Sequence, residues 1–135
     1  SQPVIAAQLK LAVTAYKEKR WADARKLAER IRHHCELARD FAGMVHFEGG
    51  GWELTAPVTM SLVCFRYAPA GMSEADIARV NAAIMEQVNA AGVAYLSHTK
   101  LNGKYTLRLA IGNIRTDRSH VEAAWAALRS AAAVI

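Results

Sequence analysis

The sequence is poor in cysteine and proline, with 2 Cys and 3 Pro among its 135 residues. Two cysteines, at positions 35 and 64, cannot form the disulfide framework that stabilises small secreted domains. They fit a reducing compartment, where an unpaired cysteine behaves as a small apolar residue. We therefore expect a cytoplasmic protein. Residues 1–4 offer neither a basic start nor a cleavage site, which predicts no secretory signal.

Long hydrophobic runs are also absent. No apolar stretch reaches the roughly 20 residues that a membrane-spanning helix needs, so we expect no integral membrane protein. The chain is nevertheless 53% hydrophobic and only 21% charged, which excludes a disordered segment. Its length suits one domain with one core.

Acidic residues are outnumbered, with 12 Asp and Glu against 17 Lys and Arg and a net charge of +5. The excess is concentrated in residues 1–44, which hold 9 basic and 5 acidic side chains. Because the two signs alternate there, the pattern is typical of a solvent-exposed helical face. We therefore expect no nucleic-acid partner.

Apolar periodicity and turn residues divide the chain into eight elements. The three glycines at 49–51 separate the leading helices from the first strand, and Ser73 with Asp76 predicts a helix start. The predicted elements are helices over 3–17 and 21–44, strands near 52 and over 60–67, a helix over 74–91, strands over 94–101 and 104–112, and a helix capped by Thr116. This order predicts an α+β fold: a mostly antiparallel sheet of three or four strands with helices packed on it, preceded by two helices.

Asn102-Gly103 between strand-forming residues predicts a two-residue hairpin. Its register places four residue pairs on one face of the sheet: Leu101 with Lys104, Thr99 with Thr106, Ser97 with Arg108, and Tyr95 with Ala110. The other face carries leucines that we expect to pack on helices. The first face is thus polar around one guanidinium. It is either an ordinary solvent-facing side of a sheet or a site that grips an anion.

Other reactive side chains form no recognisable site. His33, His34 and Cys35 are consecutive, so they point in three directions and cannot hold a metal together. Cys64 lies within an apolar strand, which favours a core cysteine over a nucleophile. We expect no metal site and no catalytic set.

Several stretches resemble the carboxy-terminal small domain of the group II pyridoxal-phosphate-dependent amino-acid decarboxylases, which has the aspartate-aminotransferase-like fold (fold type I). The resemblance covers about residues 31–128 and leans toward the aromatic-amino-acid branch. Leu9-Lys10-Leu11 is similar to the opening of the family's connecting helix, but residues 12–20 depart from its pattern. The matching residues are Leu62-Val63-Cys64-Phe65-Arg66, Asn89-Ala90-Ala91-Gly92, the hairpin from Thr99 to Ile111, Asn113, Thr116 and Trp125.

The resemblance implies how the chain is organised and what the parent protein does. Residues 1–45 would link to a large domain that is absent from this chain, and residues 46–135 would form the small domain, together making one structural unit. The parent would be a homodimeric carboxy-lyase acting on an amino acid. Its pyridoxal phosphate would be held by a lysine that follows a histidine in the large domain.

The resemblance also assigns roles within this chain. None of its six lysines follows a histidine, so we expect no catalytic residue and no cofactor bound to the chain alone, which would be inactive. Arg108 matches an arginine that binds the substrate carboxylate or lies close to it in parts of the family. Ser97, Thr99 and Thr106 are the hydroxyl residues that we expect to support Arg108.

Two further functions fit the residues. A stand-alone α+β module could bind anionic ligands or RNA on its sheet, although the hairpin lacks the paired exposed aromatics of an RNA-stacking strand. A non-catalytic interaction domain could instead form a dimer through Leu9, Val13 and Tyr16 of the first helix.

Overall fold

The computed structural model describes residues 2–17 and 20–135, and its elements follow the predicted order. The α+β prediction is confirmed. Among the described residues, no helix has the length and apolar character needed to cross a bilayer. The elements are α1 (Gln2–Lys17), α2 (Trp21–Glu48), β1 (Trp52–Leu54), β2 (Leu62–Tyr67), α3 (Glu74–Ala91), β3 (Ser97–Leu101), β4 (Lys104–Ala110) and α4 (Arg118–Val134).

The four strands form one antiparallel sheet in the order β1-β2-β4-β3. Asn102 and Gly103 have φ of 50° and 79°, as the predicted hairpin turn requires. Three of the four predicted pairs form, including Ser97 with Arg108. The fourth is wrong: β3 begins at Ser97, so Tyr95 does not pair with Ala110.

Two asparagines of α3 tie this helix to the main chain of the sheet. Asn81 is fully buried; its side chain accepts the N–H of Tyr67 at the end of β2 and donates to the Tyr67 carbonyl. Asn89 does the same for Leu96, at 2.7 and 3.0 Å. By holding Leu96 against α3, Asn89 draws residues 93–96 away from β4, which explains why β3 starts later than predicted.

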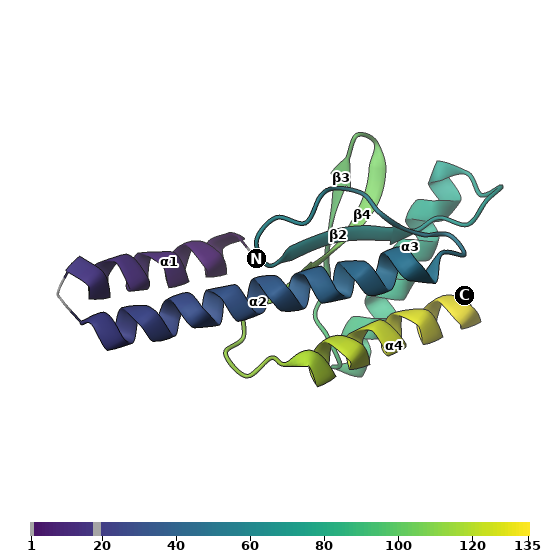
Figure 1. The fold of residues 1–135 in the computed structure, drawn as a ribbon. Helices are drawn as coiled ribbons and strands as arrows, with labels where there is room; N and C mark the ends of the chain where they lie inside the picture. Colours follow the sequence, from purple (N-terminus) through teal and green to yellow (C-terminus); the bar gives the residue numbers. More distant parts are fainter. Residues whose placement is uncertain (1, 18–19) are drawn as a thin grey trace.

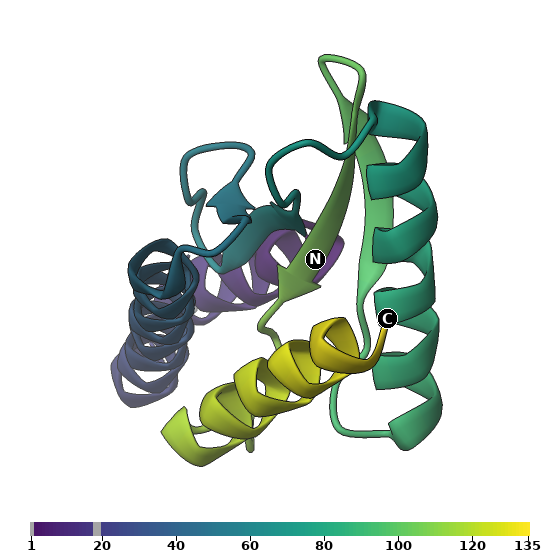
Figure 2. The same ribbon diagram turned by 90° about the vertical axis from the view of Figure 1, so that its right-hand side faces the viewer.

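The core lies on one face of the sheet, where α2, α3 and α4 meet the strands. Figure 2 shows α3 running beside the strands and α4 crossing below them. Phe41 of α2 makes edge-on ring contacts with Phe65 of β2 and Trp125 of α4, and Trp52 of β1 completes the aromatic cluster. The leucines of the hairpin's apolar face, Leu107 and Leu109, are buried in this core as predicted.

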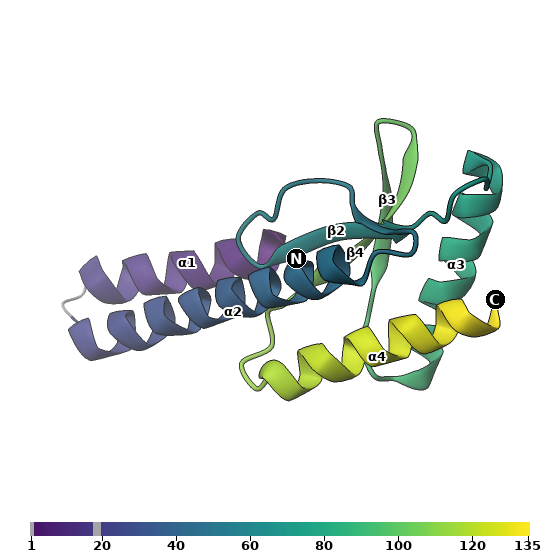
Figure 3. The ribbon, with the colours of Figure 1, turned by 45° about the vertical axis from the view of Figure 1, so that its right-hand side comes forward.

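The helices α1 and α2 lie side by side, and their joined ends project away from the sheet in Figures 1 and 3. Ile5 and Ala15 of α1 are buried. Leu9, Val13 and Tyr16 are instead 41%, 50% and 61% exposed. Of the apolar residues at helical spacing in α1, Ile5 is therefore buried while Leu9, Val13 and Tyr16 face solvent.

The end of α2 and the start of α4 are two helix boundaries at which the sequence prediction can be compared with the structure. Helix α2 ends at Glu48, four residues beyond the predicted end at 44, and the three glycines that follow all have positive φ. A Cβ at Gly51 would approach the Pro69 Cα to 2.7 Å, so this position requires glycine for space as well as for φ. Thr116, however, is not the cap of α4. Asp117 caps it by accepting two main-chain N–H groups, while the His120 ring accepts the N–H of Asp117.

His34 of α2 is a buried residue that the apolar pattern did not predict. The ring is fully buried, and neither ring nitrogen has a hydrogen-bond partner. Burial is the main reason that the pKa of His34 is lowered. The Asn113 main chain near the ring acts in the opposite direction, although outside normal hydrogen-bond geometry, and nearby His33 and Arg30 lower the pKa further.

We expect stability to fall as the pH drops below about 6.5, the unperturbed pKa of histidine. Below that pH the unfolded chain binds a proton on His34 that the folded chain, with its lowered pKa, still excludes. Urea unfolding between pH 7.5 and 5 should show a smaller decline for His34→Leu than for the unmodified chain. His46, an exposed histidine of the same helix that does not adjoin His34, provides the control, and His46→Gln should keep the full decline. A parallel decline in all three proteins would contradict this role of His34.

Candidate functional site

Two arginines lie on the face of the sheet opposite the core, and their surroundings differ. Arg66 of β2 is 5% exposed and forms ion pairs with Glu53 of β1 and Glu74 of α3. Burial alone would lower the pKa of Arg66, but the hydrogen bonds with Glu74 and Glu53 outweigh it, so the pKa is raised. Arg66 is a neutralised structural cation that joins three elements.

Arg108 of β4 has no such partner. It is half-buried, and among the described residues no carboxylate lies within ion-pair distance of its guanidinium. Its Nε donates a hydrogen bond to the Ser97 hydroxyl of β3 at 3.1 Å. This bond fixes the side chain at one nitrogen and leaves the two terminal nitrogens for another acceptor. A carboxylate fits that fork with two parallel hydrogen bonds.

Cys64 lies on the other side of Arg108, directly opposite it in the pairing of β2 with β4. The thiol is 9% exposed. Burial raises the pKa of Cys64, and the positive charge of Arg108 opposes that rise. A protonated, buried thiol is a poor nucleophile. Cys64 is buried, as predicted, but on the face of the sheet that carries Arg108 and not in the main core cluster.

Three hydroxyl residues were expected to support Arg108. Among them, Ser97 is hydrogen-bonded to Arg108 in the described structure. Thr106 is fully buried and donates to the main-chain carbonyl of Lys104. The register places Thr106 in the row of the buried Arg66, which explains why it is not part of an exposed polar surface. Thr99 is half-buried, and no hydrogen bond links it to Arg108 in the described structure.

Sequence reasoning missed two groups of residues. One is the pair of glutamates that neutralise Arg66, and the other is Asn81 and Asn89, which hold the main chain at Tyr67 and Leu96 and are called the asparagine clamps below. Glu53 and Glu74 are distant in sequence from each other, so only the folded sheet shows that they share one arginine. Asn81 did leave a signal. It interrupts the apolar side of α3 between Ile77 and Ile84, where a polar residue has to find buried partners.

Comparison with known proteins supports one family. No family model matches the chain. Tyrosine decarboxylase 4 of Petroselinum crispum is 41% identical over 108 residues, which cover 77% of this chain and 21% of that protein. Tryptophan decarboxylase 2 of Oryza sativa subsp. japonica is 40% identical over 102 residues, covering 76% and 20%. A crystal structure of Oryza sativa TDC with PLP and tryptamine superposes with a TM-score of 0.76 and 31% identity, covering 82% of this chain and 24% of that one.

The chain is a relative of the group II pyridoxal-phosphate-dependent amino-acid decarboxylases and matches their small domain. It spans about a fifth of the length of the decarboxylases that it matches. The predicted resemblance and the fold type I architecture are thereby confirmed. The sequence resemblance pointed to the aromatic-amino-acid branch of the family. The two relatives named above agree with it, since they are a tyrosine and a tryptophan decarboxylase.

The described residues of this chain do not fit the cofactor itself. Pyridoxal phosphate is held in enzymes through a Schiff base with a lysine. Lys10, Lys17, Lys26, Lys100 and Lys104 are all exposed, and none lines either of the two cavities found in the described chain. Lys19 lies outside the described residues. What this part of the molecule offers chemically is an anchored arginine.

Proposed function

We propose that this chain is the carboxy-terminal small domain of a pyridoxal-phosphate-dependent decarboxylase of aromatic amino acids, and that Arg108 binds the carboxylate of the substrate. One observation carries the assignment of Arg108: it is fixed by Ser97 yet has no carboxylate partner among the described residues, unlike Arg66 on the same face. The names of the relatives support the choice of aromatic amino acids.

The contribution of Arg108 is orientation. Holding the carboxylate at two points fixes the direction of the bond that breaks, and positioning of this kind supplies a large part of many rate enhancements. The guanidinium remains protonated throughout, so it moves no proton. The electron-accepting chemistry comes from the cofactor, which the rest of the parent enzyme would hold.

The proposal requires partners. The parent's large domain would supply the lysine and the cofactor, with residues 1–45 of this chain as the link and residues 46–135 as the small domain. A second subunit would complete a homodimer. The lengths of the relatives support a larger partner domain, because this chain matches about a fifth of each.

A hybrid enzyme tests the proposal. In it, this chain replaces the matching segment of tyrosine decarboxylase 4 of Petroselinum crispum, to which it is 41% identical. We expect the hybrid to bind pyridoxal phosphate, seen by its absorbance, and to release carbon dioxide from tyrosine. A hybrid that binds the cofactor but releases no carbon dioxide would contradict the proposed function.

The isolated chain is the control. Mixed with pyridoxal phosphate and tyrosine, it is expected to form no lasting cofactor band and to release no carbon dioxide. Turnover by the chain alone would show that it is a complete enzyme. Salt-sensitive binding of single-stranded RNA by the chain would instead favour the stand-alone binding module.

A further inference from the structure

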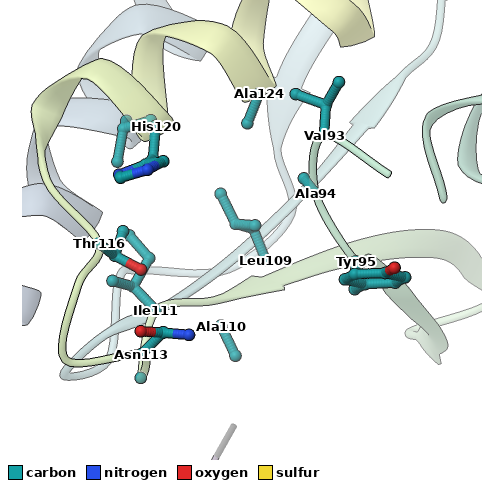
Figure 4. Close-up of a pocket in the computed structure, with 12 residues that line it drawn as sticks. Val93, Ala94, Tyr95, Leu109, Ala110, Ile111, Asn113, Thr116, His120 and Ala124 are labelled. Atoms are coloured by element: carbon teal, nitrogen blue, oxygen red, sulfur yellow. The ribbon is translucent and has the colours of Figure 1, made fainter. Parts of the chain in front are cut away.

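A cavity of about 260 Å³ lies where β3 stops short of its predicted start (Figure 4). Its walls are the segment that joins α3 to β3, the end of β4, and the first turns of α4. Arg108 is not one of its lining residues, so the cavity is separate from the proposed carboxylate site. It exists because Asn89 holds Leu96 against α3, and residues 93–95 therefore leave the end of β4 uncovered.

In the described part of the chain, the main-chain amide of Ala110 at the uncovered end of β4 has no main-chain partner. In an antiparallel strand, the N–H and C=O groups of successive residues face alternate sides. Ile111 donates its N–H to Ser61 on the β2 side of the sheet. The N–H and C=O of Ala110 therefore face the opposite side, toward the cavity, and no main-chain hydrogen bond joins Ala110 to Tyr95. A donor and an acceptor lie next to each other in the cavity wall.

The lining side chains form an apolar wall with an uncharged polar rim. Leu109, Ile111, Val121 and Ala124 are all buried and provide the wall. None of the 12 lining residues is Asp, Glu, Lys or Arg, so a charged ligand would find no opposite charge there. The polar lining residues are Tyr95, Asn113, Thr116 and His120.

His120 adds a further hydrogen-bonding group on the α4 side. Its Nδ1 lies 3.0 Å from the main-chain nitrogen of Asp117 and 3.1 Å from the Asp117 carboxylate, so Nε2 is the ring nitrogen left for a ligand. Figure 4 shows the His120 ring near Thr116, on the side of the cavity away from Tyr95.

We infer that this cavity binds a small, uncharged aromatic amide. The amide group pairs with the N–H and C=O of Ala110, and the aromatic ring packs on the apolar wall. A peptide strand fits less well, because pairing beyond Ala110 is limited: the carbonyl of Gly112 already accepts a hydrogen bond from Gln8. A ligand that fits the cavity therefore has a flat apolar body with a hydrogen-bond donor and an acceptor next to each other.

Benzamide is the probe for this inference. Titrated into the ¹⁵N-labelled 135-residue chain, it should shift the N–H signals of Ala110, Ile111 and Val121 in a saturable manner, with a Kd of about 1 mM. Benzoate, which adds a charge, and toluene, which lacks the amide, should each bind at least about tenfold more weakly.

Two pairs of variants locate the site. Ala124→Leu fills the cavity from α4 and should weaken benzamide binding at least about tenfold, whereas Ala123→Leu, on the exposed side of the same helix, should leave it unchanged. If Ala124→Leu does not fold, Ala94→Leu fills the cavity from the opposite wall, and exposed Ala91→Leu is its control.

Three results would overturn the inference. One is the absence of saturable shifts up to about 10 mM benzamide. Another is that the cavity-filling variants bind benzamide as well as the unmodified chain does, or that toluene binds the chain as tightly as benzamide does. The third is tighter binding of a capped tri-alanine peptide than of benzamide, which would indicate strand addition at the edge of β4.

Discussion

Replacing Arg108 with alanine in the hybrid decarboxylase is expected to lower kcat/KM for tyrosine by about 100-fold, or ~3 kcal/mol. The arginine is held in place by Ser97 and has no competing carboxylate among the described residues, so the substrate carboxylate would lose its charged partner outright. Arg108→Lys should recover only part of the activity, because an ammonium cannot form the two-point contact of a guanidinium. Steady-state kinetics with tyrosine measure both effects.

Two controls separate carboxylate binding from a general loss of structure. Arg79→Ala removes an exposed arginine that pairs with Asp76 on the same helix, and kcat/KM should not change. Ser97→Ala should weaken the enzyme less than Arg108→Ala, and Ser97→Thr should restore it, because the hydroxyl acts by positioning Arg108. Normal kinetics for Arg108→Ala in a correctly folded hybrid would remove Arg108 from the site.

The largest expected loss of stability comes from Asn81→Leu, which should lower the free energy of unfolding by about 3 kcal/mol. The leucine fits a buried helix position but leaves both main-chain groups of Tyr67, at the end of β2, without their partners. Buried donors and acceptors that lose their hydrogen bonds retain the full desolvation penalty. Urea unfolding of the 135-residue chain measures the change.

Gln87→Leu is the matched control for Asn81→Leu. Gln87 is exposed on the same helix, so the same kind of replacement should change stability by no more than about 0.5 kcal/mol. Asn81→Asp should fall between the two, since it keeps an acceptor for the Tyr67 N–H and loses the donor to the Tyr67 carbonyl. Equal destabilisation by Asn81→Leu and Gln87→Leu would show that the asparagine clamp contributes little.

The features that local sequence determines were predicted correctly. Asn102-Gly103 specifies a turn whose backbone angles few other pairs adopt, and this turn sets the register that brings Ser97 beside Arg108. The helix predicted over 74–91 ends at Ala91, and Gly92 follows it in the left-handed conformation that glycine adopts readily. Both signals act within a few residues, so tertiary packing did not override them.

The features that depend on contacts between distant residues were not predicted. The start of β3 is set by Asn89 on the preceding helix, not by the strand propensity of residues 94–96. Thr116 and Asp117 are both good helix caps, and the hydrogen bond that the Asp117 N–H donates to the His120 ring favours Asp117. Burial of His34 likewise depends on packing between elements, which helical periodicity alone does not reveal.

The two asparagine clamps make α3 a spacer of fixed length. Asn81 and Asn89 are eight residues apart, which corresponds to about 12 Å along a helix. They bind the last residue of β2 and the residue that precedes β3, and these two strands are not neighbours but flank β4 on either side. Adding or removing one residue between the clamps would rotate one of them by about 100° and release it. Relatives that keep both asparagines should therefore show substitutions, but no insertions or deletions, in this part of the helix.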